Sequence, residues 1–212
     1  MADKESTYEA ITSAFAGSTY PGDEFLIGSR EGREPFDEIA PFRGRSNWKE
    51  LDAEFLDEHA VALHFFSEGG LRFFLPAFLV AGLRGELRVA DPLFTLTDGF
   101  SDTAVEIRVK GREFLIKTGK SQFINPKRYG AITFFDYARY RLSVFTRDEA
   151  SAIVAYLEFK PHSDDVQKLQ KERTDTALDS FWRERAESAP EVKDLQSYLQ
   201  EQAEYLRAVT AT

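Results

Sequence analysis

The side chains that could hold a metal ion or move a proton are few in this sequence. Its three histidines are His59, His64 and His162. His59 and His64 are five positions apart, so they do not share one helical face as an i, i+4 pair would. The lack of cysteine excludes disulfides, thiolate metal sites and thiol catalysis. We therefore predict no metal site and no cofactor.

Residues 118–121, Thr-Gly-Lys-Ser, match only the end of a phosphate-binding loop. The full motif needs a glycine at position 114, where the chain has Phe114, and a following helix whose amides meet the phosphates. Residues 122–126 are a poor helix start, so we interpret 118–121 as a turn. A Gly-x-Ser-x-Gly elbow is also missing. The sequence thus favours a non-enzyme without deciding the point.

One polar cluster is predicted where a pocket could form, at the mouth of the most apolar segment, 67–84. Arg72 stands out because a charge in so apolar a helix needs a carboxylate, a carbonyl or water. Glu68, one turn earlier, is the nearest candidate partner, and His64 precedes the helix. Since pockets place a few polar groups in an apolar wall, we predict Arg72, His64 and Glu68 as ligand-binding candidates.

Positive charge is concentrated between residues 105 and 147, which carry ten Lys or Arg and three Asp or Glu in a chain of net charge −9. Aromatic residues interleave this segment, and cations with stacking rings suit single-stranded nucleic acid. The competing interpretation is a solvated or partner-facing surface over an aromatic core, and the net negative charge weighs against nucleic acid. The candidate patch residues are Arg108, Lys110, Arg112, Lys117, Lys120, Lys127 and Arg128.

A helix over 67–84 is the element that must position the polar cluster. Apolar residues recur there at three- and four-residue spacing and fill most of the circumference, which predicts a buried helix. Ser67 is its N-cap, and Gly82 or Gly85 can end it. Pro76 lies inside, where proline costs about 3 kcal/mol. Surrounding packing must therefore hold the segment.

Further helices and a hairpin are predicted on either side. An apolar stripe over 48–56 has the helical period, and Thr146 with Glu149 forms a capping box for a helix that Pro161 ends. Alternation over 105–117 predicts a β-hairpin, and 93–96 could supply a third strand. Two charged helices follow, over 163–187 and from Pro190 onward.

The predicted fold class is mainly α (α+β), a helical domain around a buried central helix with an inserted β-hairpin and two C-terminal helices. Residues 1–160 form one globular domain with the hairpin near 104–118, and 161–212 form a helical pair packed on it. Neither a secretory signal nor a membrane-spanning run is apparent, so a soluble cytoplasmic protein is expected.

A Trp-x-x-Leu pair and a Leu-Pro-Ala-aromatic-Leu run stand out, at Trp48 and Leu51 and at residues 75–79. Residues 145–157 and 177–182 add two helical stretches. Together these parts resemble a family of uncharacterised, mostly bacterial proteins, a domain of unknown function. The hairpin region departs from the family pattern. The resemblance implies a small helical cytosolic domain without an assigned activity, so no catalytic residue is carried over.

Two classes of function follow. The first is a non-enzymatic interaction or accessory protein, favoured by the missing catalytic motifs, the charge asymmetry and the amphipathic C-terminal helices. The second is a small-molecule-binding domain or enzyme with a pocket near the central helix. Self-association through the final two helices is compatible with both, and a membrane is not an expected partner.

Overall fold

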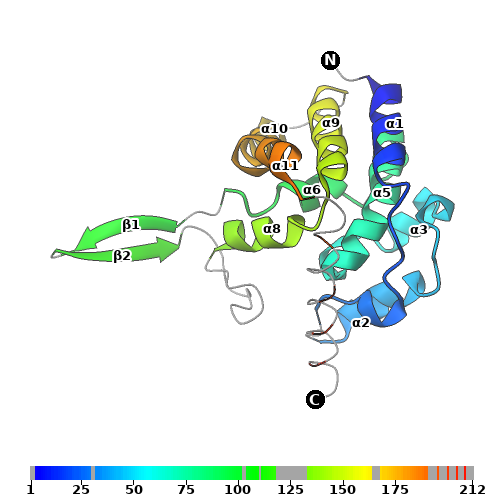
Figure 1. Cartoon of the computed structure of the whole chain (residues 1–212), viewed down its shortest axis with the longest axis horizontal. Helices are drawn as coiled ribbons and strands as arrows, with labels where there is room; N and C mark the ends of the chain where they lie inside the picture. The colour runs from blue at the N-terminus through cyan, green and yellow to red at the C-terminus, as the bar shows by residue number, and fades with distance from the viewer. Residues whose placement is uncertain are drawn as a thin grey trace.

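The computed structural model describes residues 3–29, 32–101, 104–109, 111–117, 133–163 and 168–190, with single positions 195, 200, 204 and 208. Within these ranges the chain is mainly helical, which confirms the mainly α part of the predicted fold class (Figure 1). The α-helices are α1 (Lys4–Ala14), α2 (Glu34–Ile39), α3 (Ala53–Glu58), α4 (Ala62–Phe65), α5 (Glu68–Arg84), α6 (Pro92–Thr97), α8 (Phe134–Leu142), α9 (Arg147–Ser163), α10 (Lys168–Ala177) and α11 (Arg183–Ser188). Short 3-10 turns are η1 (Asp23–Phe25), η2 (Ala40–Phe42) and η3 (Trp48–Glu50), and the π-helical stretch η4 (Leu178–Trp182) joins α10 to α11.

The central helix α5 forms as predicted. The amide of Gly70 donates to Ser67 Oγ at 3.0 Å, and Gly85 ends the helix in the left-handed conformation at φ 75°. Fourteen of its seventeen residues are buried, so packing on all sides compensates for Pro76 in its interior. Despite this apolar character, none of the helices in the described ranges is long and apolar enough to cross a bilayer.

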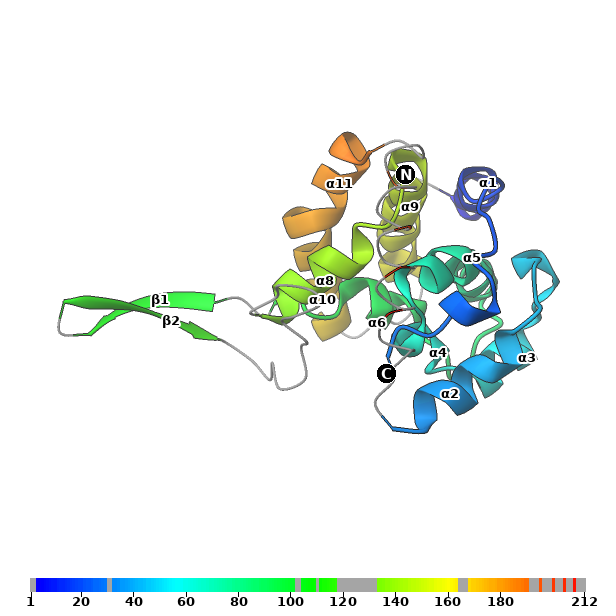
Figure 2. The ribbon, with the colours of Figure 1, turned by 60° about the horizontal axis from the view of Figure 1, so that its bottom comes forward.

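Helix α9 lies between α1 and α11 in both views of the ribbon, and α5 contacts α1, α3, α6 and α9 (Figures 1 and 2). Just before α9, the ring of Phe145 packs at 6.1 Å from Phe15 and at 5.9 Å from Trp182. The indole of Trp182 donates to the carbonyl of Leu96 at 2.8 Å. These contacts pack aromatic residues from near both ends of the described chain into one core.

The segment 93–96 is helical, so its prediction as a strand was wrong. The carboxylate of Asp91 accepts from the amide of Phe94 at 3.1 Å, and Pro92 occupies the first turn of α6. An N-cap followed by proline is a helix start. These two local signals outweigh the period of a four-residue apolar run.

The C-terminal helices differ from the prediction in their bounds. Pro161 does not end α9, which continues to Ser163, because a proline in the last turn removes only one hydrogen bond. The next helix starts at Lys168 and runs through η4 to Ser188, and Leu169, expected on its apolar side, is 64% exposed. The second predicted helix, from Pro190 onward, lies almost wholly outside the described residues.

Strands β1 (Ala104–Val109) and β2 (Arg112–Lys117) pair antiparallel, with Arg108 opposite Glu113 and Val109 opposite Arg112. Gly111 makes the turn at φ 76°, a conformation that favours glycine. Figure 1 draws the pair as two long arrows.

Asp57 holds the connection between α5 and α6 against α3. Its carboxylate accepts from the backbone amides of Arg88, Val89 and Ala90 at 2.8, 3.0 and 2.9 Å. Desolvation raises the pKa of Asp57, but the three amide hydrogen bonds together outweigh it and leave the pKa below its usual value. The ionised carboxylate is therefore the form that stabilises this connection.

We expect Asp57→Asn to lower the free energy of unfolding by about 1–3 kcal/mol at neutral pH, because hydrogen bonds to a charged group are stronger than those to an amide. Because the pKa of Asp57 is lower in the folded than in the unfolded chain, its stabilising contribution is complete above the unfolded pKa of about 3.9. The contribution is lost as the pH falls through the folded pKa. Denaturant unfolding should therefore show the parent–variant gap closing in acid. A gap that is unchanged at low pH contradicts this role, and the exposed Asp175→Asn serves as the control.

Candidate functional site

Arg72 is bound within the chain, to a residue that was not predicted. Its Nε donates to both carboxylate oxygens of Glu149, at 3.0 and 2.9 Å, across 77 positions of sequence. The prediction of Glu68 as its partner was wrong, because burial brings the start of α9 against α5. The same carboxylate accepts from the amide of Thr146 at 2.9 Å, and Thr146 Oγ accepts from the amide of Glu149 at 3.3 Å. The predicted capping box is thus confirmed.

Of the three predicted pocket residues, Glu68 and Arg72 lie one turn apart on α5, and His64 lies on α4. Glu68 is 1% exposed in the first turn of α5, and the Arg72 side chain is engaged by Glu149. His64 belongs to α4 and is the only one of the three that lines a cavity described below. Ligand binding by Arg72 and Glu68 stays a prediction.

His59, at the end of α3, contacts Glu38 and two phenylalanine rings. Its Nδ1 lies 3.8 Å from Glu38 Oε2, and its ring packs against Phe42 and Phe55. Among the described residues, no group of three or more His, Asp or Glu side chains is placed to hold a metal ion.

The predicted basic patch is described only in part. Arg108, Arg112 and Lys117 lie on β1 and β2. The other four patch residues lie outside the described residues, namely Lys110, Lys120, Lys127 and Arg128. Contact with nucleic acid through this patch stays a prediction.

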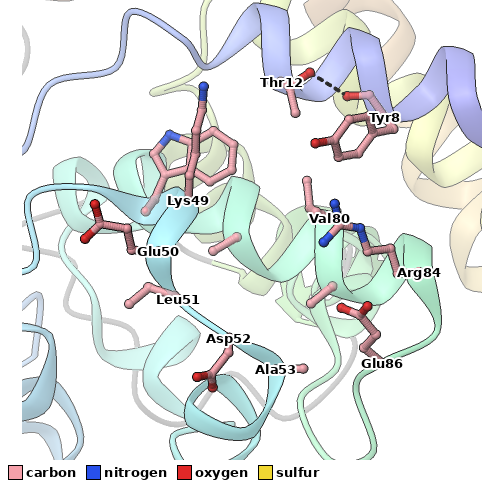
Figure 3. Close-up of a pocket in the computed structure, with 13 residues that line it drawn as sticks. Tyr8, Thr12, Lys49, Glu50, Leu51, Asp52, Ala53, Val80, Arg84 and Glu86 are labelled. Carbon is pink, nitrogen blue, oxygen red and sulfur yellow. Dashed lines mark hydrogen bonds between the residues drawn. The ribbon is translucent and has the colours of Figure 1, made fainter.

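The larger cavity, here named the α5 groove, has a volume of about 730 Å³ and lies between α1, the segment 48–53 and the C-terminal half of α5 (Figure 3). Three small buried side chains of α5 line it, Ala77, Val80 and Ala81. Polar and aromatic side chains from the other two segments surround them, among them Tyr8, Thr12, Trp48, Lys49, Glu50 and Asp52. The result is an apolar floor inside a polar rim.

Two cations of the groove rim lie over aromatic rings. The guanidinium of Arg84 is 5.2 Å from the ring centroid of Tyr8, and the ammonium of Lys49 is 5.5 Å from that of Trp48. These are the distances of cation–π contacts. In Figure 3 the two cations lie on different segments of the rim, and Arg84 lies below Tyr8.

Two carboxylates of the rim already have partners in the chain. Glu50 accepts from the side-chain amide of Asn47 at 2.8 Å, and Asp52 caps α3 through the amide of Phe55 at 2.9 Å. Glu86 adds an acidic group near Arg84. The charge pattern therefore offers a partner both signs, with the cations held by rings.

A smaller cavity of about 200 Å³, here named the Arg141 cavity, lies between α4, α6 and α8. Desolvation, and then the positive charge of Arg141, lowers the pKa of His64 on its wall, while Asp98 and Asp91 oppose the shift. His64 is nevertheless an exposed residue, so this desolvation is only partial. With a pKa below its usual value, His64 is a neutral imidazole at pH 7.

Neither cavity could be located from linear spacing. The groove joins residues from positions 8 to 86, and the Arg141 cavity joins residues from 64 to 142. The adjacent pair Trp48 and Lys49 was the one local signal, since an aromatic beside a cation can form a cation–π contact.

A model of a family of unknown function, DUF6714, matches residues 3–186. The chain belongs to this family. The match spans the groove, the Arg141 cavity and the contact between Arg72 and Glu149. Neither the curated proteins nor the solved structures contain a match. The DUF6714 family has no assigned function, so the function of this chain is inferred from the geometry of its described residues.

The pair of Arg72 and Glu149 should behave as one unit. Arg72→Met and Glu149→Gln should each lower the free energy of unfolding by about 3–5 kcal/mol, because each leaves a buried partner uncompensated. The double variant should lose less than the sum, with a coupling of about 0.5–3 kcal/mol. Denaturant unfolding of the four proteins measures this.

The exposed pair of Arg183 and Glu158, whose side chains are 52% and 47% exposed, is the matched control. The cycle Arg183→Met with Glu158→Gln should show a coupling below about 1 kcal/mol. Additive losses at Arg72 and Glu149 would show that the two residues act independently.

Proposed function

We propose that this DUF6714 protein is a non-enzymatic interaction protein that binds a segment of a partner protein in the α5 groove. The observation that carries the proposal is the floor of Ala77, Val80 and Ala81 between two ring-supported cations. Small side chains leave room for an apolar group of the partner. Helical and extended segments commonly bind such grooves through a few apolar contacts.

The rim chemistry indicates what the partner segment carries. Lys49 and Arg84 are exposed and held over rings, so they lose little side-chain freedom when an anion binds. Glu50 and Asp52 are engaged by Asn47 and by the amide of Phe55. With Glu86 also on the rim, the partner segment that fits is an apolar side chain flanked by residues of both charges, with its acidic residues placed at Lys49 and Arg84.

The proposal includes two statements about how the chain is organised. The strands near 104–118 are an insertion in the helical domain, and 161–212 form a helical pair packed on it. Contacts of α10 with α6 and of α11 with α9 support the second statement for the part of the pair that is described. Self-association would make a second copy of the chain the partner.

The test is a comparison of tagged proteins recovered from the native cell with their bound partners. The double reversal Lys49→Glu with Arg84→Glu should lower recovery of a specific partner about tenfold or more, since one factor of ten needs only about 1.4 kcal/mol. The matched control reverses Lys168 and Lys171 on α10, whose side chains are 91% and 54% exposed. It should retain the partner.

Thermal unfolding checks that all variants fold, and sedimentation at several concentrations identifies a second copy as the partner. A parent chain recovered alone and monomeric contradicts the proposal. So does a partner that binds the groove reversal as well as it binds the parent.

Contact with single-stranded nucleic acid is the alternative, favoured by the +7 balance of residues 105–147. Arg141, one of those cations, is only 7% exposed and lies in α8, so it does not add to a surface patch. Filter binding of single-stranded RNA and DNA at low salt tests this alternative, because phosphate contacts are strongest there. No retention at low salt ends it.

A further inference from the structure

The Arg141 cavity contains a buried cation that forms no ion pair with any carboxylate of the described residues. Arg141 is 7% exposed, and within the described residues its one hydrogen bond goes from Nη2 to the carbonyl of Leu63. A guanidinium has five N–H donors. Among the described carboxylates none lies within ion-pair distance of it. Burying a charge without a counter-charge is costly, so this arrangement is suited to an anion that enters from the cavity.

A second group in the same cavity also lacks a partner. Thr95 of α6 is 6% exposed, and its hydroxyl has no hydrogen-bond partner among the described residues. Buried hydroxyls in native proteins nearly always have a partner, which can be a ligand or water. Thr95 lines the cavity together with Arg141, so one bound molecule can reach both.

The walls of the cavity are fixed by a close backbone approach. Gly99 has φ 88°, and a Cβ built there would lie 2.7 Å from the carbonyl oxygen of Phe134. Only glycine allows the chain just after α6 to come this close to the start of α8. At the start of α8, Thr133 and Asp136 form a capping box that orients the helix carrying Arg141. The cavity is thus preorganised rather than a gap between loose elements.

We propose that the Arg141 cavity binds a small monocarboxylate, held by the guanidinium of Arg141 and the hydroxyl of Thr95. Arginine pairs with planar carboxylates through two parallel hydrogen bonds. A volume of about 200 Å³ corresponds to about seven waters at about 30 Å³ each, which limits the ligand to a short-chain acid.

Asp98 distinguishes a monocarboxylate from a phosphate. Its carboxylate lines the cavity and pairs with Arg173 at 2.7 Å. A second negative charge on the ligand would face Asp98 unfavourably. A hydroxyl or amino group beside the carboxylate could instead donate to Asp98 or to the neutral ring of His64. Leu142 and Ala138 supply the apolar part of the wall.

Calorimetric titration of the full chain tests the proposal with acetate, lactate, alanine and inorganic phosphate. We expect a Kd in about the millimolar range for the carboxylates, as befits a ligand of few atoms, and weaker binding of phosphate. Lactate or alanine binding more tightly than acetate identifies a 2-hydroxy or 2-amino acid as the preferred class. Absence of carboxylate binding up to about 10 mM, ten times a 1 mM Kd, overturns the proposal, and so does equal or tighter binding of phosphate.

Two variants locate the ligand. Arg141→Met should weaken carboxylate binding about tenfold or more, and Thr95→Val, which keeps the shape, should weaken it about threefold to tenfold. Arg139→Met is the matched control, because Arg139 is exposed on the same helix and should leave the Kd unchanged.

Thr95→Val keeps the test decisive if Arg141→Met does not fold. Unchanged affinity in Thr95→Val places the ligand elsewhere and overturns the assignment. The groove reversal at Lys49 and Arg84 should bind carboxylate normally, so this proposal and the proposed partner groove fail separately.

Discussion

The carboxylate of Glu149 is the interaction on which the arrangement of the core depends. It accepts two hydrogen bonds from Arg72 of α5 and one from the amide of Thr146. One buried carboxylate therefore caps α9 and neutralises the charge of Arg72. If Glu149 bound only one of these two groups, either the guanidinium of Arg72 or the amide of Thr146 would be buried without this partner. The turn between α8 and α9, residues 143–146, is here named the α9 corner. It is also held by Arg185 of α11, which donates to the carbonyl of Phe145 at 3.0 Å. The central helix and the α9 layer are therefore fixed relative to one another.

This corner also positions the proposed binding sites. Helix α8 leads directly into it, so the placement of Arg141 against Leu63 depends on how the corner sits on α5. On the other side of α5, the contact of α1 with both α5 and α9 sets the distance of Tyr8 from Arg84. The groove and the cavity are thus separate in space but share one support.

Local signals in the sequence were enough for the elements that organise the fold. Ser67 and Gly85 define α5, and Thr146 with Glu149 defines the start of α9, because caps depend on residues three or four positions apart. The partner of Arg72 could not be found this way, since the nearest carboxylate in sequence is not the nearest in space. The groove and the Arg141 cavity were missed for the same reason, because each is assembled from segments far apart in the chain.

The two sites differ in how their charges act. Lys49 and Arg84 are exposed, so their attraction for an anion is screened by salt and contributes more to the rate and specificity of association than to affinity. Arg141 is shielded from water, where an ionic contact is stronger and an unmet charge is more costly. A reversible protein contact fits the first environment, and a small ligand that completes the hydrogen bonds of its site fits the second. Because Arg141 is positioned through α8 and the same corner that Glu149 holds, occupancy of the cavity should stabilise the helices that carry the groove.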